Sequence, residues 1–213
     1  MKITIGYLYH DLLNLYGDSG NIKTLKYHLN EQGIDTVIKY MSVNDKKDFS
    51  DVDILYIGSG TEDNLLVALE DLKKDEKALI NYVNNNGFIL STGNSVELFG
   101  NYIIADKKIK TLGAYDYVSM HQDRIVKDIR IKTNLIDEDI IGFENHIGNI
   151  LSYDDSIINI NNFYGTYIIG PILVRNPKFC SFLIKELILS KDKDFKFKEE
   201  DYKLDELAYS NVK

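Results

Sequence analysis

The side chains best suited to chemistry in this 213-residue chain lie in short polar segments beside glycines. Glu144, Asn145 and His146 are consecutive, so a carboxylate, an amide and an imidazole come together at one place. Ser59 lies in a second segment, the glycine turn 58–60, which follows an apolar stretch. The polar cluster would line a pocket or a partner interface, or tie down a turn by its own hydrogen bonds, and the backbone N–H groups of the glycine turn would bind a carbonyl oxygen or simply form a tight turn. Both interpretations are open for each segment.

The other histidines and the cysteine do not predict a metal site. His10, His28 and His121 are isolated, and none has a second ligand at the spacing of His-x-x-x-His. The single cysteine, Cys180, excludes an intramolecular disulfide and a cysteine-rich metal cluster. The chain also has no Walker-type phosphate-binding motif. We therefore expect no metal and no cofactor.

The elements that would position the polar segments are strands and helices in alternation. In the first half of the chain, short apolar runs alternate with helical patterns, which predicts a mostly parallel sheet flanked by helices. The predicted strands are 2–6, 36–40, 53–57 and 88–90, and the predicted helices are 21–32, 64–72 and 78–85. The carboxyl ends of parallel strands meet at one edge of a sheet. We therefore expect the turn Gly58–Gly60 and the residues Gly93 and Asn94 to lie near each other there.

The second half of the chain has a different pattern. Alternating polar and apolar residues predict strands at 115–119, 124–133, 140–145 and 157–167, which makes this half β-rich and suggests an antiparallel extension of the same sheet. A closing helix is predicted at 177–190. Residues 191–213 are strongly charged, and we expect a tail that is mobile or docks on a partner. Without an internal repeat or linker, residues 1–213 are expected to form one domain.

The charge and hydropathy of the chain exclude some classes of protein. Acidic residues outnumber basic ones by 33 to 25, and the net charge of -8 disfavours binding to nucleic acid. No signal-peptide pattern is present, and no apolar run approaches the roughly 20 residues that a membrane span requires. We expect no membrane insertion. With one cysteine, the chain suits a reducing cytoplasm, so a cytoplasmic localisation is expected.

Four segments spread along the chain form an ordered set of motifs. They are LYHDLLNLYGDSGN at 8–21, the glycine turn 58–60, GFENH at 142–146 and GTYIIGP at 165–171. Together they resemble the class I, triad-type glutamine amidotransferases of the cobyric acid synthase type. Within that family, the resemblance is strongest to the glutaminase subunit of lipid II isoglutaminyl synthase. Such a series of motifs is far more specific than one glycine-rich turn.

The resemblance implies a flavodoxin-like class I glutamine amidotransferase domain, which hydrolyses glutamine to glutamate and ammonia. The ammonia passes to a synthetase partner, which in the lipid II case resembles a Mur ligase. The chemistry needs a thiolate at a strained strand-to-helix elbow, where the helix N-terminus lowers the cysteine pKa. It also needs a histidine as base and backbone N–H groups that face the oxyanion. The turn 58–60 corresponds to the family's oxyanion turn.

The chain departs from the family at both reactive positions. Members read roughly Cys-Gly-Gly-Tyr-Gln at the elbow, where this chain reads Gly-Asn-Ser-Val-Glu at 93–97, so the nucleophile position is Gly93. Members also carry a histidine in a Gly-Thr-Tyr-x-His-Gly segment, and that position is Ile169 here. Glycine has no side chain and isoleucine cannot transfer a proton. The comparison therefore predicts a glutaminase subunit without its nucleophile and base.

Two side chains are candidates to replace the nucleophile. Ser95 lies two positions past the elbow, where the helix has begun, so its hydroxyl is expected to point away from the thiolate position. Cys180 lies in the apolar stripe of the closing helix, which is the usual setting of a small core residue. Ser91 and Thr92 precede the elbow and are expected to face the core or to cap backbone groups.

Three functions follow from these observations. The first is a degenerate glutaminase subunit that acts as scaffold or regulator of a Mur-ligase-like amidating partner in cell-wall precursor modification. The second is an active amidotransferase, of the lipid II or cobyric acid type, with a non-standard nucleophile. The third is a module that binds glutamine or another small ligand in the crevice where the family binds glutamine.

Overall fold

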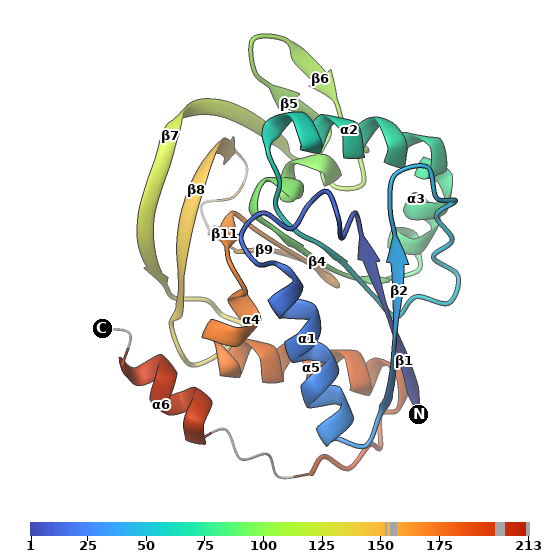
Figure 1. Ribbon diagram of the computed structural model, residues 1–213, viewed down its shortest axis with the longest axis vertical. Helices are drawn as coiled ribbons and strands as arrows, with labels where there is room; N and C mark the ends of the chain where they lie inside the picture. Colours follow the sequence, from blue (N-terminus) through green and yellow to red (C-terminus); the bar gives the residue numbers. More distant parts are fainter. Residues whose placement is uncertain (152, 154–156, 199–202, 212–213) are drawn as a thin grey trace.

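The computed structural model describes residues 1–151, 153, 157–198 and 203–211 and has an α/β architecture (Figure 1). In the first half, strands alternate with helices in the predicted order. The strands are β1 (Lys2–Leu8), β2 (Asp35–Met41), β3 (Ile54–Ile57) and β4 (Phe88–Thr92). The helices are α1 (Ser19–Glu31), α2 (Glu62–Leu72), the 3₁₀ helix η1 (Lys73–Asp75) and α3 (Glu76–Asn84). Each predicted element of this half is confirmed to within a few residues.

The main sheet has six strands in the order β2-β1-β3-β4-β10-β9, where β9 is Ile157–Ile160 and β10 is Phe163–Thr166. Strands β1 to β4 and β10 pair in parallel, and only β9 is antiparallel to its neighbour. The carboxyl ends of β1, β3 and β4 therefore meet at one edge of the sheet, as the alternation of elements predicts.

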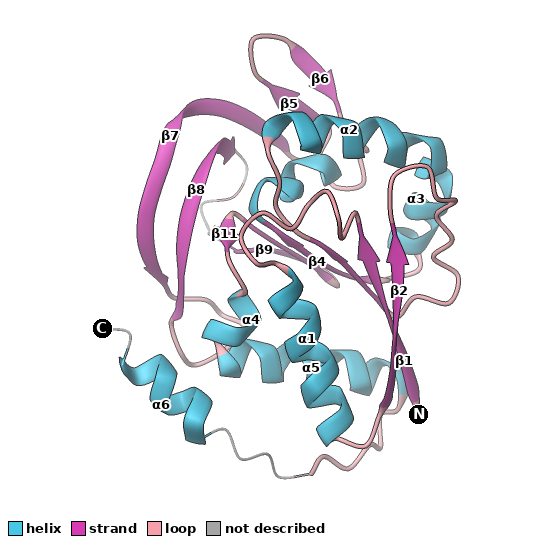
Figure 2. Ribbon diagram, viewed as in Figure 1, coloured by secondary structure: helices cyan, strands magenta, loops and turns pink. Residues whose placement is uncertain are grey.

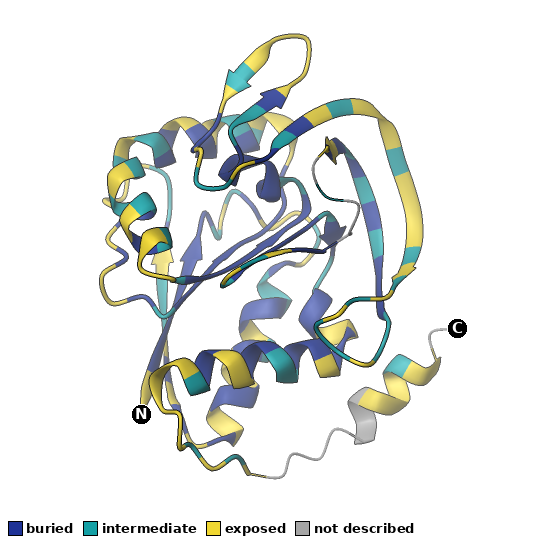
Figure 3. Ribbon diagram, turned by 180° about the vertical axis from the view of Figure 1, so that it is seen from behind, coloured by how far each residue is buried: buried dark blue, intermediate teal, exposed yellow. Residues whose placement is uncertain are grey.

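Two hydrophobic cores cover the two faces of this sheet. Along β3, Ile54 and Tyr56 pack in the core that includes α1 and α5 (Pro177–Lys191). Leu55 and Ile57 pack in the core that includes α2 and α3. Successive strand residues point to opposite faces, so a strand covered on both sides must be apolar throughout. Figure 2 shows helices on both sides of the sheet, and Figure 3 shows the central strands as fully buried.

The β-rich second half is confirmed, but most of it forms a separate sheet. Its five strands follow the order β11-β8-β7-β5-β6. They are β5 (Tyr102–Ile104), β6 (Lys108–Lys110), β7 (Val118–Ile131), β8 (Ile140–Ile150) and β11 (Ile168–Ile169). The predicted antiparallel extension of the main sheet is correct for β9, whereas β10 joins that sheet in parallel and the prediction is wrong for these five strands. Alternation identifies strands but does not show which sheet they join.

Two predicted strand boundaries are wrong. The strands predicted at 115–119 and 124–133 are one strand, β7, whose pairing with β8 shifts between His121 and Ile125. The polar residues at this irregularity caused the apparent break. The single strand predicted at 157–167 is the hairpin β9–β10 followed by β11, because the chain turns at Asn161 with a φ of 53°. Asparagine tolerates this left-handed conformation, so the turn needs no glycine.

The C-terminal part contains the predicted closing helix, α5, preceded by a short helix α4 (Ile172–Arg175). The segment expected to be a charged tail includes a further helix, α6 (Lys203–Asn211). The Tyr209 hydroxyl donates to the carbonyl oxygen of Asp139 at 2.6 Å, and Lys178 pairs with Glu206 at 3.0 Å. This part of the segment therefore packs against its own chain, whereas residues 199–202 and 212–213 lie outside the described ranges. Among the described helices, none is long and apolar enough to cross a membrane.

A buried ion pair contacts the first residue of the loop that follows β1. Lys47 and Asp71 form a direct ion pair, and their side chains are 0% and 3% exposed. Lys47 also donates to two carbonyl oxygens, and the Tyr9 hydroxyl donates to Asp71 at 3.1 Å. Burial by itself raises the pKa of Asp71, but hydrogen bonds from Lys47 and Lys74 outweigh it and lower the pKa to about 2. Tyr9 begins the loop that leads to the site described below.

Replacement of Lys47 by methionine leaves the Asp71 carboxylate buried without its main partner. We expect Lys47→Met to lower the free energy of unfolding at pH 7 by about 3 kcal/mol, measured by urea unfolding. The pKa of Asp71 is depressed, so its contribution is present above pH ~4 and is lost as the pH falls toward 2. The control is Lys73→Met, which breaks an exposed pair with Glu70 and should cost less than ~1 kcal/mol. Equal losses in the two variants would contradict the prediction.

Candidate functional site

The predicted elbow is present at the carboxyl end of β4. The chain passes from Thr92, in extended conformation, to Gly93, which has a φ of +66°. It then enters η2 (Gly93–Phe99), a 3₁₀ helix where an α-helix was expected. A residue with a side chain adopts this left-handed conformation only at a cost, which is how a nucleophile is held in a strained elbow.

Gly93, Ser59 and Ile169 lie together although they are far apart in the sequence. A Cβ atom built on Gly93 would lie 2.4 Å from the Ser59 Cβ, 2.5 Å from the Ser59 Oγ and 3.0 Å from the Ile169 Cγ2. The positions predicted to correspond to nucleophile and base are thus neighbours in space. The space that a side chain on Gly93 would occupy is already filled by Ser59 and Ile169.

The buried carboxylate of Asp18 holds the three loops at this edge of the sheet. It accepts hydrogen bonds from the Tyr16 N–H at 3.2 Å, the Tyr56 hydroxyl at 3.3 Å and the Thr92 hydroxyl at 3.2 Å. The backbone N–H of Ser59 is a further donor. Asp18 is 0% exposed, and burial raises its pKa despite these bonds. Sequence reasoning missed its role, although it lies in the quoted segment 8–21.

The backbone N–H groups of the predicted oxyanion turn already have partners. The Gly60 N–H donates to the Asn94 Oδ1 at 3.1 Å, and the Asn94 Nδ2 donates back to the Gly60 carbonyl at 2.9 Å. The Ser59 hydroxyl donates to the same Asn94 oxygen at 3.3 Å. The Ser59 N–H also acts on the Asp18 carboxylate and opposes the rise in its pKa, so the turn interacts with side chains on both sides.

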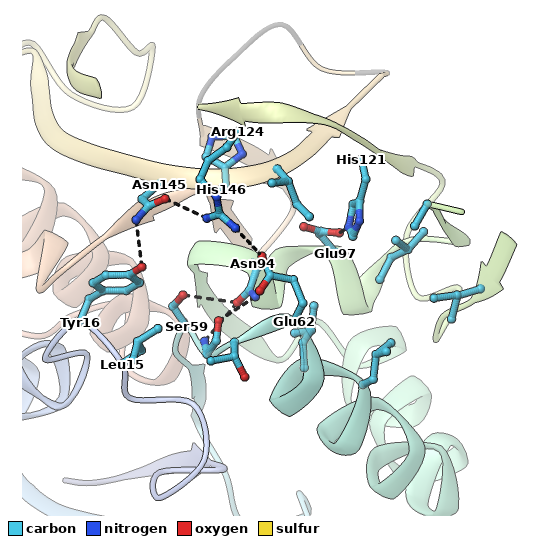
Figure 4. A pocket seen from close by; sticks show the side chains of 18 residues that line it. Leu15, Tyr16, Ser59, Glu62, Asn94, Glu97, His121, Arg124, Asn145 and His146 are labelled. Carbon is cyan, nitrogen blue, oxygen red and sulfur yellow. Dashed lines mark hydrogen bonds and ion pairs between the residues drawn. The ribbon is translucent and has the colours of Figure 1, made fainter. Parts of the chain in front are cut away.

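A cavity of about 420 Å³ lies beside the elbow (Figure 4). Five predicted ligand-binding residues line it: Ser59, Gly60, Asn94, Asn145 and His146. The other predicted site residues do not: Gly58, Gly93, Glu144 and Ile169. The volume lies within the usual range of small-molecule sites. The sequence therefore identified part of a cavity wall, but the nucleophile and base positions lie outside that wall.

Arg124 forms the polar rim of the cavity, and sequence reasoning missed it. Its guanidinium donates to the Asn145 Oδ1 at 3.0 Å and to the Glu62 Oε1 at 3.2 Å. The Asn145 Nδ2 donates to the Tyr16 hydroxyl at 3.1 Å. Figure 4 shows this chain of contacts crossing the cavity from β7 to α2. The irregular pairing of β7 between His121 and Ile125 is the local feature that directs Arg124 here.

His121, isolated in the sequence, pairs with Glu97 in the structure. Its Nε2 lies 2.9 Å from the Glu97 Oε2, and the two residues come from β7 and η2. Glu97 is 1% exposed, and its hydrogen bond raises the pKa of His121. No group of three or more potential metal ligands occurs within the described ranges. The pair is thus a hydrogen-bonded imidazole and carboxylate at the cavity wall, and its spacing in the sequence gave no signal.

Glu144 and His146 divide between two surroundings. The His146 Nδ1 lies 2.6 Å from the Gly148 carbonyl oxygen, and its ring stacks on Tyr167 at 4.0 Å. Its Nε2 has no hydrogen-bond partner and lies 3.7 Å from the Glu144 Oε2. Burial raises the pKa of Glu144, but His146 and Lys127 outweigh it and lower the pKa. His146 thus shapes a turn and lines both the cavity and a second hollow, whereas Glu144 lines only the second hollow.

The two candidate substitute nucleophiles point away from the cavity or lie far from the elbow. The Ser95 hydroxyl contacts the Ser91 Oγ at 2.8 Å and donates to the Thr92 carbonyl at 2.9 Å. Ser95 is 0% exposed, on the core side of η2. Cys180 is also 0% exposed and packs in the core around α5. Neither residue lines the cavity.

Comparison with known proteins shows the family to which the chain belongs. Residues 4–173 match the family described as the CobB/CobQ-like glutamine amidotransferase domain. The chain belongs to this family. A curated relative from Streptococcus pneumoniae, the GatD subunit of lipid II isoglutaminyl synthase (glutamine-hydrolyzing), is 30% identical over 213 residues, or 89% of this chain and 82% of the relative. The GatD subunit from Staphylococcus aureus is 28% identical over 222 residues, or 94% and 90% of the two chains.

Solved structures support the same fold at low sequence identity. PurLQS from Thermotoga maritima has a TM-score of 0.52 at 13% identity and covers 89% of this chain and 99% of that chain. A crystal structure of a glutamine amidotransferase also has a TM-score of 0.52 at 13% identity and covers 86% and 98%. These similarities concern the fold alone. The expected class I glutamine amidotransferase fold is confirmed.

Two matched variants separate the two costs of a side chain at residue 93. One cost is the clash with Ser59, and the other is the strain of the left-handed backbone conformation. Gly17 has a φ of +77° and open space where a Cβ would lie, so Gly17→Ala should cost about 1 kcal/mol from backbone strain alone. Gly93→Ala adds the clash with Ser59 and should cost about 3 kcal/mol in urea unfolding. A Ser59→Gly background should remove most of the difference. Equal costs of the two alanine variants would show that the elbow is not crowded.

The protonation of Asp18 gives a second test of the site's geometry. Burial raises its pKa, so we expect Asp18 to titrate above the ordinary value of ~3.9 and Asp71 near 2, in a carboxyl-carbon NMR titration. A raised pKa means that the folded state binds this proton more tightly than the unfolded state. The stability contribution of Asp18 therefore grows as the pH falls through its folded-state pKa and is complete below ~3.9. A midpoint for Asp18 at or below ~3.9 would contradict the prediction.

Proposed function

We propose that this chain is a degenerate glutaminase subunit, which has lost glutamine hydrolysis and acts as scaffold or regulator of a Mur-ligase-like amidating partner. The observation that carries the proposal is the position of Gly93. The elbow that holds the nucleophile in the family has no side chain, and a Cβ built there meets Ser59 and Ile169. The reactive atom is absent, and its space is filled.

The hydrogen bonds around the elbow also support a loss of chemistry. Covalent glutamine hydrolysis needs free N–H donors at the developing oxyanion. Here Asn94 bonds both backbone groups of Gly60, and Asp18 takes the N–H of Ser59. A single substitution at Gly93 would leave these donors occupied. The pattern therefore agrees with divergence of the whole site.

The partner is proposed from the relatives. Both curated relatives are named as subunits of a glutamine-hydrolysing lipid II isoglutaminyl synthase, so each acts within a larger enzyme. By analogy, we propose that this chain binds a synthetase that resembles a Mur ligase and acts in cell-wall precursor modification. Such a partner would draw on ammonium from another source. A cytoplasmic location follows from the same proposal.

An active enzyme with another nucleophile has less support. The Ser95 hydroxyl is engaged with Ser91 and with backbone carbonyls, and Cys180 lies in the core. Glu97 and His121 could exchange a proton with a ligand, but a base alone does not supply the covalent step of glutamine hydrolysis. A ligand-binding function is favoured by one observation, the preserved cavity of about 420 Å³.

The proposal predicts complex formation without glutamine turnover. The purified chain, alone and with the ligase-like partner, should release no more glutamate from glutamine than a denatured sample. The partner should amidate its acceptor with ammonium, and faster when this chain is added. The control Ser95→Ala should behave as the natural chain in both assays. Glutamate release above the denatured sample, abolished by Ser95→Ala or Cys180→Ala, would contradict the proposal.

A further inference from the structure

The cavity beside the elbow extends into an apolar recess. Its far wall consists of aliphatic side chains from α2, the β5–β6 hairpin and β8: Leu65, Leu66, Ile103, Ala105, Ile109 and Ile147. The hairpin contributes Ile103, Ala105 and Ile109 to the cavity wall, which Glu97 and His121 also line (Figure 4). A volume of about 420 Å³ is ample for a small molecule, because an apolar cavity of ~150 Å³ holds benzene. The recess is therefore large enough for a branched or cyclic apolar group.

The charged side chains that line the cavity are already paired with each other. Glu97 pairs with His121 at 2.9 Å, and Glu62 pairs with Arg124 at 3.2 Å. A ligand that carries a net charge, or two separated charges, would have to break one of these pairs or remain uncompensated at an apolar wall. Glutamine carries both an ammonium and a carboxylate group. The electrostatics of the wall therefore disfavour glutamine and favour an uncharged ligand.

The amide side chains of the cavity are also occupied. Both ends of Asn94 bond Gly60, and both ends of Asn145 bond Arg124 and Tyr16. The Nε2 of His121 bonds Glu97, and no described residue bonds its Nδ1. His121 lines the cavity, so this nitrogen can meet one hydrogen-bonding group of a ligand whose body fills the recess.

We infer that the cavity binds an uncharged small molecule with a branched or cyclic apolar body and one hydrogen-bonding group, in place of zwitterionic glutamine. This inference rests on the proposed loss of glutaminase function, and it names the ligand class of the same cavity. The apolar body lies against Leu66 and the β5–β6 hairpin. Its polar group contacts His121, and the two ion pairs stay intact.

Three probes with one carbon skeleton test the role of charge: isovaleramide, isovalerate and isopentylammonium. Each is titrated into the isotope-labelled full chain at pH 7, and the NMR signals of the cavity residues are followed. Isovaleramide should bind with a dissociation constant in the millimolar range, as its few atoms allow. The anion and the cation should each bind at least roughly tenfold more weakly, and L-glutamine should cause no saturable shift. Equal binding of the three probes, or tighter binding of glutamine, would overturn the inference.

Two substitutions on α2 locate the binding site. Leu66→Trp fills the recess and should weaken isovaleramide binding by more than ~tenfold, whereas Val67→Trp should change it by less than ~twofold, because Val67 is 48% exposed and does not line the cavity. Unfolding curves of both variants show whether they are folded. Unchanged binding in folded Leu66→Trp would overturn the inference.

The binding and glutaminase assays together separate the two proposals. Amide-selective binding together with glutamate release would contradict only the proposed function. No binding and no release would overturn only this inference.

Discussion

The candidate site depends on one buried carboxylate, that of Asp18. It has no cation beside it among its hydrogen-bond partners, and it is stabilised by Tyr16, Tyr56 and Thr92 and by a backbone N–H. These donors belong to the loop after β1, to β3 and to the end of β4. One residue thus bonds to three chain segments at once, and further bonds such as Leu15 N–H to the Ser59 carbonyl at 2.9 Å join the same loops. A buried carboxylate is costly unless such donors satisfy it, so the segments cannot separate without exposing or protonating it.

The position of Ser59 follows from this arrangement. Its hydroxyl donates to the Asn94 Oδ1, and its side chain lies where a Cβ atom on Gly93 would be. Asn94 then closes the turn by bonding both backbone groups of Gly60. The loops predicted to present a nucleophile and an oxyanion site are here bonded to each other. These hydrogen bonds involve neither Gly93 nor Ile169, so they do not depend on a reactive side chain at either position.

The sequence predicted the features that depend on local residue patterns and on local backbone conformation. Alternating patterns identified the strands and helices of the first half, and the glycine at 93 marked the elbow because only glycine adopts that turn without cost. The features that depend on tertiary packing were missed. Glu97 and His121 meet only because η2 and β7 cross at the cavity, and no spacing in the sequence indicates it. The second sheet was missed for the same reason, since alternation does not specify strand partners.

We propose that the elbow at Gly93 keeps a left-handed turn but has no nucleophile. The most direct test exposes the folded chain to an electrophilic glutamine analogue, such as a diazoketone, and measures its intact mass. The analogue forms a stable covalent bond with a nucleophile positioned in a glutaminase site. We predict an unchanged mass at concentrations that fully label an active glutaminase in the same tube. An adduct that forms on the folded chain and maps to a residue of the elbow or the cavity wall would contradict the account.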